Sequence, residues 1–146
     1  MTHRHWPFLA GVIGAILFLG GTASAEVCPG VKPSVEQELR SSSMVVVGTA
    51  TEAHKVPSWT SGYAYTIYVV HVDEAIHGTA SKSFWLYSPT TAEYPMTVGV
   101  PHILFVHHKP MEDVVDRCGN SAPLGHAGDT YRAAKAAANT PDHATP

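Results

Sequence analysis

Histidines are the residues of this chain most able to do chemistry, because a neutral imidazole ring is a common ligand of zinc, copper and nickel. The sequence has ten of them. His71 lies in a long run of strand-forming residues, and His102 and His107 lie in and just after a later run. One hypothesis is therefore a metal site formed by these three histidines with a nearby carboxylate.

Other features of the sequence favour a different interpretation of the histidines. His107 and His108 are adjacent, so in a strand their side chains point to opposite faces and cannot easily share one ion. The chain contains neither an HExxH nor a CxxC motif. We therefore favour solvent-exposed histidines at strand ends, and keep a periplasmic metal-binding protein as the alternative function.

No residue pattern indicates catalysis. Serine, histidine and aspartate all occur, but Ser58 and Ser121 lack the flanking glycines of a nucleophile elbow. The sequence does not assign the roles of nucleophile, base and oxyanion stabiliser to any set of side chains. We expect a protein that is not an enzyme and that needs no cofactor.

The first 25 residues have the three parts of a secretory signal peptide. Arg4 supplies positive charge, residues 6–20 form an apolar run, and Ala23 and Ala25 form the A-x-A pattern for cleavage. An uncleaved anchor is the alternative, but a spanning helix needs roughly 20 apolar residues and this run is shorter. We expect cleavage after Ala25 and an exported protein, periplasmic or extracellular, without stable membrane insertion.

The two cysteines fit this expectation of export. An oxidising compartment favours a disulfide between Cys28 and Cys118 over two free thiols. Such a bridge would close a loop of roughly 90 residues and stabilise the fold by about 4 kcal/mol through the entropy of the unfolded chain. The chain has 146 residues, and the 146 − 25 = 121 that remain without the leader are enough for one domain. The formal net charge of the whole chain is −3, which gives no support to nucleic-acid binding, for which a basic surface is expected.

Aromatic residues offer another candidate site, an exposed patch that binds a protein or a glycan. The residues concerned are Trp59, Tyr63, Tyr65 and Trp85. The alternative, which we prefer, is that Tyr65 and Trp85 belong to the core of the domain. Trp59 lies in a segment rich in proline, serine and glycine, so we expect it to be exposed on a loop.

The elements that must position these residues are mostly strands. Ser34 and Gln37 form a capping-box pattern, which predicts a short helix after Ser34. Runs of β-branched and aromatic residues predict five strands. They are expected at residues 44–50, 63–76, 84–87, 102–106 and 114–115, with loops at residues 57–62 and 88–98.

The end of the chain is expected to be helical. Asp129 should cap a helix over residues 130–138, whose alanines offer little to bury, and residues 139–146 should form a frayed tail. Five strands with two flanking helices predict a mainly β fold, a small Greek-key barrel. A β-sandwich is the structural alternative.

Several short motifs occur along the chain in a characteristic order. They are Cys28-Pro29, residues 43–48, residues 65–78, Leu104-Phe105-Val106 and Arg117-Cys118-Gly119-Asn120-Ser121. In this order the sequence resembles the bacterial branch of the netrin-like and tissue-inhibitor-of-metalloproteinases-like (TIMP-like) OB-fold domains. The resemblance implies a five-stranded OB-fold Greek-key barrel with a short N-terminal helix, a C-terminal helix and one disulfide. After the signal peptide (1–25), we therefore expect the OB-fold domain (26–125) and then a C-terminal helix with a flexible tail (126–146).

The resemblance also implies a function, with one departure. Inhibitors of this family chelate the zinc of a metalloprotease through the amine of an N-terminal cysteine. Cleavage after Ala25 would leave Glu26 and Val27 ahead of Cys28, so that amine would not exist here. We therefore expect an exported, non-enzymatic binding module for a protein partner, with a metalloprotease as one candidate and another mechanism of inhibition. The expected binding residues form a ridge held by the disulfide, together with one loop residue: Glu26, Val27, Cys28, Pro29 and Trp59.

Overall fold

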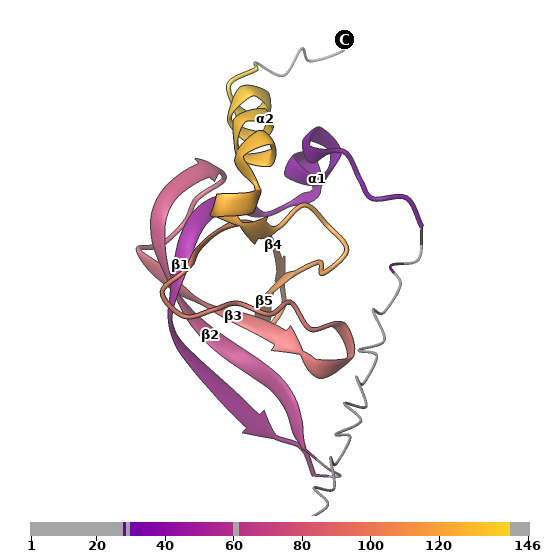
Figure 1. The fold of residues 1–146 in the computed structure, drawn as a ribbon, viewed down its shortest axis with the longest axis vertical. Coiled ribbons are helices and arrows are strands. Elements are labelled where there is room, and N and C mark those ends of the chain that lie inside the picture. Colours follow the sequence, from indigo (N-terminus) through magenta and orange to yellow (C-terminus); the bar gives the residue numbers. More distant parts are fainter. Residues whose placement is uncertain (1–27, 29, 60–61, 141–146) are drawn as a thin grey trace, which may run out of the picture.

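In the residues that it describes, a computed structural model shows a mainly β protein with two α-helices and one disulfide (Figure 1). It describes Cys28, residues 30–59 and residues 62–140. The expected signal peptide (1–25) and the expected binding residues Glu26, Val27 and Pro29 lie outside these described residues, as does the end of the expected tail. Within the described part of the chain, no helix is long and apolar enough to span a membrane.

The five predicted strands are confirmed, each longer than predicted at one or both ends, and a sixth strand is additional. The elements are α1 (Val35–Ser41), β1 (Met44–Pro57), β2 (Tyr63–His77), β3 (Ser83–Pro89), η1 (Thr90–Ala92), β4 (Pro101–Lys109), β5 (Glu112–Val115), β6 (Ala122–Pro123), η2 (Leu124–His126) and α2 (Gly128–Ala138). The sequence did not predict β6 because neither alanine nor proline favours a strand.

The strand pairings form a closed ring. β1 pairs antiparallel with both β2 and β4, β2 pairs antiparallel with β3, and β4 pairs antiparallel with β5. β3 and β5 form the single parallel pair among these, and β6 adds to β4. The order β1-β2-β3-β5-β4 therefore returns to β1.

The β1–β2 hairpin extends beyond this ring as an arm. β1 leaves β4 at the pair Thr49 and Pro101, but its pairing with β2 continues to Pro57 and Tyr63. In Figure 1 the arm points away from both helices. The sequence predicted a strand that ends at Ala50, where the run rich in β-branched residues stops. The structure shows that most of the residues after Ala50 are exposed and still belong to β1. Hydrogen bonding to β2 alone makes them a strand.

Two clusters of apolar side chains lie on opposite sides of the sheet. The first fills the inside of the ring and includes Val46, Val70, Leu86, Leu104 and Val106, all fully buried. The second lies between the sheet and the two helices and includes Leu39, Val45, Ile103, Phe105 and Ala134. Because successive side chains of a strand point to opposite faces, the continuous apolar runs of β1 and β4 supply both clusters.

The two helices differ in how well the sequence predicted them. The capping box of α1 is confirmed: the Ser34 hydroxyl accepts a hydrogen bond from the Gln37 amide at 3.1 Å, and the Gln37 side chain accepts one from the Ser34 amide at 3.0 Å. The cap assigned to Asp129 is wrong, because α2 begins at Gly128 and Asp129 lies in its first turn. The alanines of α2 also bury more than predicted, since Ala134 is fully buried against the second cluster.

Candidate binding surface

Three neighbouring strands present apolar side chains on the outer side of the sheet. The register places Val56, Tyr65 and Pro89 in one row across β1, β2 and β3. The next two rows are His54, Ile67 and Tyr87, and then Glu52, Val69 and Trp85. We call the apolar members of these rows, apart from the proline, the aromatic face: Val56, Tyr65, Ile67, Val69, Trp85 and Tyr87.

The alternation of strands explains why these residues face outward. On β2, Thr66, Tyr68 and Val70 are buried inside the ring, so the residues between them point the other way. On β3, Leu86 and Ser88 are buried, which turns Trp85 and Tyr87 outward. Because β2 and β3 carry apolar residues on both sides, one set of side chains fills the ring and the other set forms an apolar outer surface.

The preferred prediction that Tyr65 and Trp85 belong to the core is therefore wrong. Trp85 is 60% exposed, and Tyr65 is only partly buried. The rings of Tyr65 and Tyr87 pack against each other on the outer side, with centroids 5.8 Å apart and planes tilted by 45°. The predicted exposure of Trp59 is confirmed, since this side chain at the end of the arm is fully exposed. Of the four aromatic residues considered from the sequence, Tyr65 and Trp85 belong to the aromatic face, and the side chain of Tyr63 lies outside those that the structure describes.

A pocket of about 370 Å³ lies at one edge of the aromatic face. It forms where β3 and β5 separate, because these strands pair only at Leu86 with Asp113 and at Tyr87 with Val114. We call it the Trp85 pocket, and its lining residues are Ser83, Phe84, Trp85, Tyr87, His108, Met111, Glu112 and Asp113. The sequence contained no signal for it, since its two walls come from segments that are distant along the chain.

The structure separates the three histidines of the predicted metal site. His102 is buried inside the ring, opposite Gly48, whereas His71 is exposed on the outer side of β2. His107 alternates with the buried Val106, so it faces away from the inside of the ring. No group of three histidine, cysteine, aspartate or glutamate residues in the described part of the chain could hold a metal ion. The prediction of His102 as a surface ligand is wrong.

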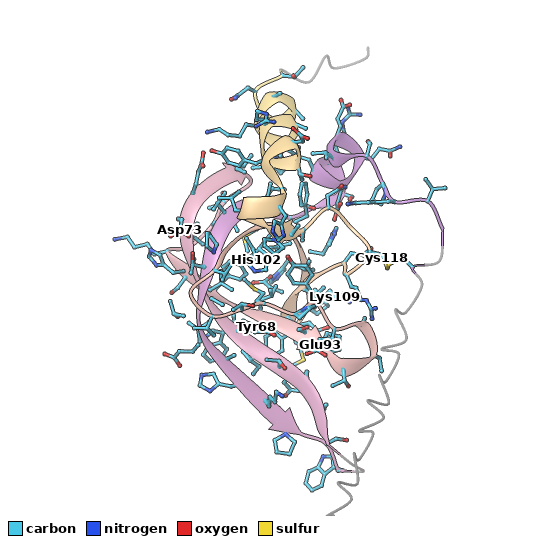
Figure 2. All side chains as sticks on the ribbon, in the orientation of Figure 1. Tyr68, Asp73, Glu93, His102, Lys109 and Cys118 are labelled. Atoms are coloured by element: carbon cyan, nitrogen blue, oxygen red, sulfur yellow. A yellow bond between two sulfur atoms is a disulfide. The ribbon has the colours of Figure 1, made fainter. Side chains whose placement is uncertain are left out.

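His102 instead belongs to a polar pair inside the ring. Its Nδ1 lies 2.8 Å from the Tyr94 hydroxyl, and its Nε2 has no hydrogen-bond partner. Figure 2 places His102 within the ring of strands. Burial lowers the pKa of His102 and raises that of Tyr94, so both are held in their neutral forms. The pair was not predictable from the sequence, because His102 and Tyr94 lie among apolar residues and no motif connects them.

The predicted disulfide is present and fixes the start of the described chain. Cys28 and Cys118 are joined, with their Cα atoms 5.6 Å apart. Next to the bridge, the buried Glu38 of α1 accepts hydrogen bonds from the backbone amide and the side-chain amide of Asn120, each at 2.6 Å. The same Asn120 side chain donates to the Pro33 carbonyl at 2.9 Å. Cys28 and Pro33 are thus attached to Cys118 and Asn120, respectively.

The carboxylate of Glu38 was not singled out from the sequence, although it is the most deeply buried acid described. Its Oε1 has no hydrogen-bond partner and lies against Gly119. Burial raises the pKa of Glu38, and the hydrogen bonds from Asn120 oppose that shift. The pattern Cys118-Gly119-Asn120 therefore has a structural explanation, because only glycine leaves room for the carboxylate that Asn120 binds.

Comparisons with known proteins add no assignment. No protein-family model matches the sequence, and no curated protein is significantly similar to it. The netrin-like resemblance accordingly stays a prediction from short motifs. The function has to be argued from the fold and from the surfaces described above.

Proposed function

We propose that the domain is an OB-fold barrel of the netrin-like type and that it acts as an exported, non-enzymatic binding module for a protein partner. Support for the fold comes from the pairing order, in which five strands close a ring with β3 parallel to β5. The helix α1 and the Cys28–Cys118 disulfide also lie where the resemblance implies them. The disulfide is consistent with export to an oxidising compartment.

The observation that carries the proposed function is the aromatic face. Tyrosine and tryptophan are enriched among the residues that contribute most to protein interfaces. Contiguous apolar patches on a protein surface mark interaction sites more often than single exposed residues do. In OB-folds, the face of strands 2 and 3 and the loops beside it form the binding site for oligonucleotides and oligosaccharides, so this is the surface of the fold where a ligand is expected. Here that face is apolar, with Trp59 in the β1–β2 connection and Met111 in the β4–β5 turn, both almost fully exposed.

A protein fits this surface better than a nucleic acid does. Single-stranded nucleic acids need aromatic rings together with a positively charged groove. The polar members of the three rows are His54 and Glu52, with no lysine or arginine among them, and the chain has a formal net charge of −3. An apolar surface without positive charge matches the depletion of charge at the centre of protein interfaces.

A second candidate function, protease inhibition, is favoured by the surroundings of Val31. Its side chain is 98% exposed, while the chain is attached on one side of it by the disulfide at Cys28 and on the other by the hydrogen bond from Asn120 to the Pro33 carbonyl. An exposed side chain held between two attachment points loses less entropy on binding than one in a free tail. The expected result is stoichiometric slowing of a metalloprotease by the exported protein, reduced at least fivefold by Val31→Asp. A broad panel of secreted proteases without any slowing would contradict this candidate.

Photo-crosslinking in the cells that make the protein tests the first proposal directly. Benzoylphenylalanine placed at Tyr87 puts the reactive group on the aromatic face, and the same residue at the exposed Ala136 of α2 is the control. We expect a discrete protein adduct from position 87 and none from position 136. Equal labelling from both positions, or no adduct from position 87, would show that the aromatic face is not a protein-binding site.

A further inference from the structure

We infer that the Trp85 pocket binds an arginine side chain of the partner that covers the aromatic face. The inference rests on the proposed function and adds the kind of residue that the partner inserts. The pocket continues the aromatic face, because Trp85 and Tyr87 belong to both. A segment lying along the face therefore reaches the pocket without leaving the surface.

The walls of the pocket suit a flat cation. Trp85 offers an indole ring that is 60% exposed, and Met111, which is 91% exposed, lies on the wall formed by the β4–β5 turn. A guanidinium group is planar and weakly hydrated, and it stacks on aromatic faces, of which indole is the most favourable. The polarizable thioether of methionine adapts to the shape of what lies against it. Together the two side chains can enclose the stem and head of an arginine.

The charges of the pocket are also those that an arginine requires. Two carboxylates, Glu112 and Asp113, line it, and no lysine or arginine does. His108 contacts Asp113 through Oδ1 alone, at 2.8 Å, and a carboxylate has further acceptor sites for a second donor. The Lys109 ammonium lies 4.0 Å from the Glu112 carboxylate, and both side chains are substantially exposed. An ion pair at this distance and exposure contributes little to stability. A guanidinium entering the pocket would meet acceptors that are not fully occupied.

A sugar is the other ligand that stacks on tryptophan and bonds to carboxylates. The charges favour the cation, because the lining holds two carboxylates whose present contacts are with the exposed side chains of His108 and Lys109 and are therefore weak. A neutral ring brings donors but no positive charge to these carboxylates. The inference therefore commits to arginine and makes a saccharide one of the results that would overturn it.

The test uses the exported, oxidised protein with carbon-13-labelled methionine methyl groups. N-acetyl-arginine methylamide is the probe, the citrulline analogue is its neutral isostere, and maltose represents a saccharide. We expect a saturable shift of the Met111 methyl signal with the arginine probe, and at least fivefold weaker binding of the citrulline probe. Met44 and Met96 are buried, so their signals are internal references that should not move.

Variants distinguish binding of the arginine probe in the pocket from its general electrostatic attraction to an acidic protein. Trp85→Ala should weaken binding about 2- to 30-fold, the range that corresponds to one cation–π contact. Asp113→Asn and Glu112→Gln keep the shape of the pocket and should each weaken it at least threefold. Val98→Ala shortens an exposed apolar side chain outside the pocket and the aromatic face and should leave binding unchanged.

The outcomes distinguish this inference from the proposed function. Equal shifts with arginine and citrulline, a saturable shift with maltose alone, or no effect of Trp85→Ala would each overturn the arginine site. A protein adduct from position 87 with no arginine binding would leave the binding module standing and remove the pocket. Arginine binding without a protein adduct from position 87 would support the pocket and contradict the proposed binding module.

Discussion

Replacing Gly119 with alanine tests the explanation given for the contact between α1 and the segment after Cys118. A Cβ atom at this position would lie 2.0 Å from Oε1 of Glu38 and 2.8 Å from its Cδ, far inside van der Waals contact. The added methyl group must therefore displace the carboxylate. In moving, Glu38 loses the two hydrogen bonds that Asn120 donates to it, each 2.6 Å long.

The size of the effect follows from these two bonds. Hydrogen bonds to a charged group contribute roughly 1.5–3 kcal/mol each, so losing both would cost about 3–6 kcal/mol. Two features reduce the loss. The carboxylate is at the end of a flexible side chain, and burial already raises the pKa of Glu38, which shows that its charged form is incompletely compensated. We therefore expect Gly119→Ala to lower the free energy of unfolding by about 3 kcal/mol.

Urea unfolding of the oxidised protein, followed by tryptophan fluorescence, measures this change. Gly125→Ala is the matched control, because a Cβ atom there would meet nothing within 4 Å and the loss should stay below about 0.5 kcal/mol. The decisive comparison repeats Gly119→Ala in a Glu38→Ala background, where no carboxylate is left to displace. There the additional loss should be below about 1 kcal/mol. An equal loss in both backgrounds would refute the explanation.

Three further predictions concern pH, the disulfide and an exposed ring. Burial lowers the pKa of His102 below its usual 6.5, so as the pH falls the unfolded chain takes up this proton before the native state does. The contribution of His102 to stability is therefore complete above about pH 6.5 and is lost below it, by at most about 1.4 kcal/mol per pH unit. His102→Asn should flatten that part of the stability–pH curve, and an unchanged slope would contradict the reasoning. Replacing both Cys28 and Cys118 with serine should cost about 4 kcal/mol in the urea assay, and a loss under about 1 kcal/mol would show that the bridge constrains little. Trp59→Ser should change the free energy of unfolding by less than about 0.5 kcal/mol, because the ring is fully exposed; a loss above about 1 kcal/mol would place it in a packed site.

The main elements were predictable because their signals are local. β-Branched and aromatic runs mark strands whatever they later pair with, and the hydroxyl of Ser34 caps a helix through residues only three positions away. The arm was not predictable past Ala50, because its polar residues become a strand only by pairing with β2. The predicted cap of α2 was wrong because the helix follows Ala127, a buried residue of the second cluster with no capping side chain, which a search for capping residues does not find.

The candidate site, too, was predictable only in its local features. The sequence by itself determined the residue types, including the paired cysteines and the rings of Tyr65, Trp85 and Trp59, and it indicated the mainly β fold that carries them. Only the tertiary structure decided which way each side chain points. An apolar residue in a strand with two apolar sides belongs equally well to either face, and the closing of the ring resolves this. That choice buried His102 and exposed Trp85, because ring closure and register depend on contacts between strands that are far apart in the chain.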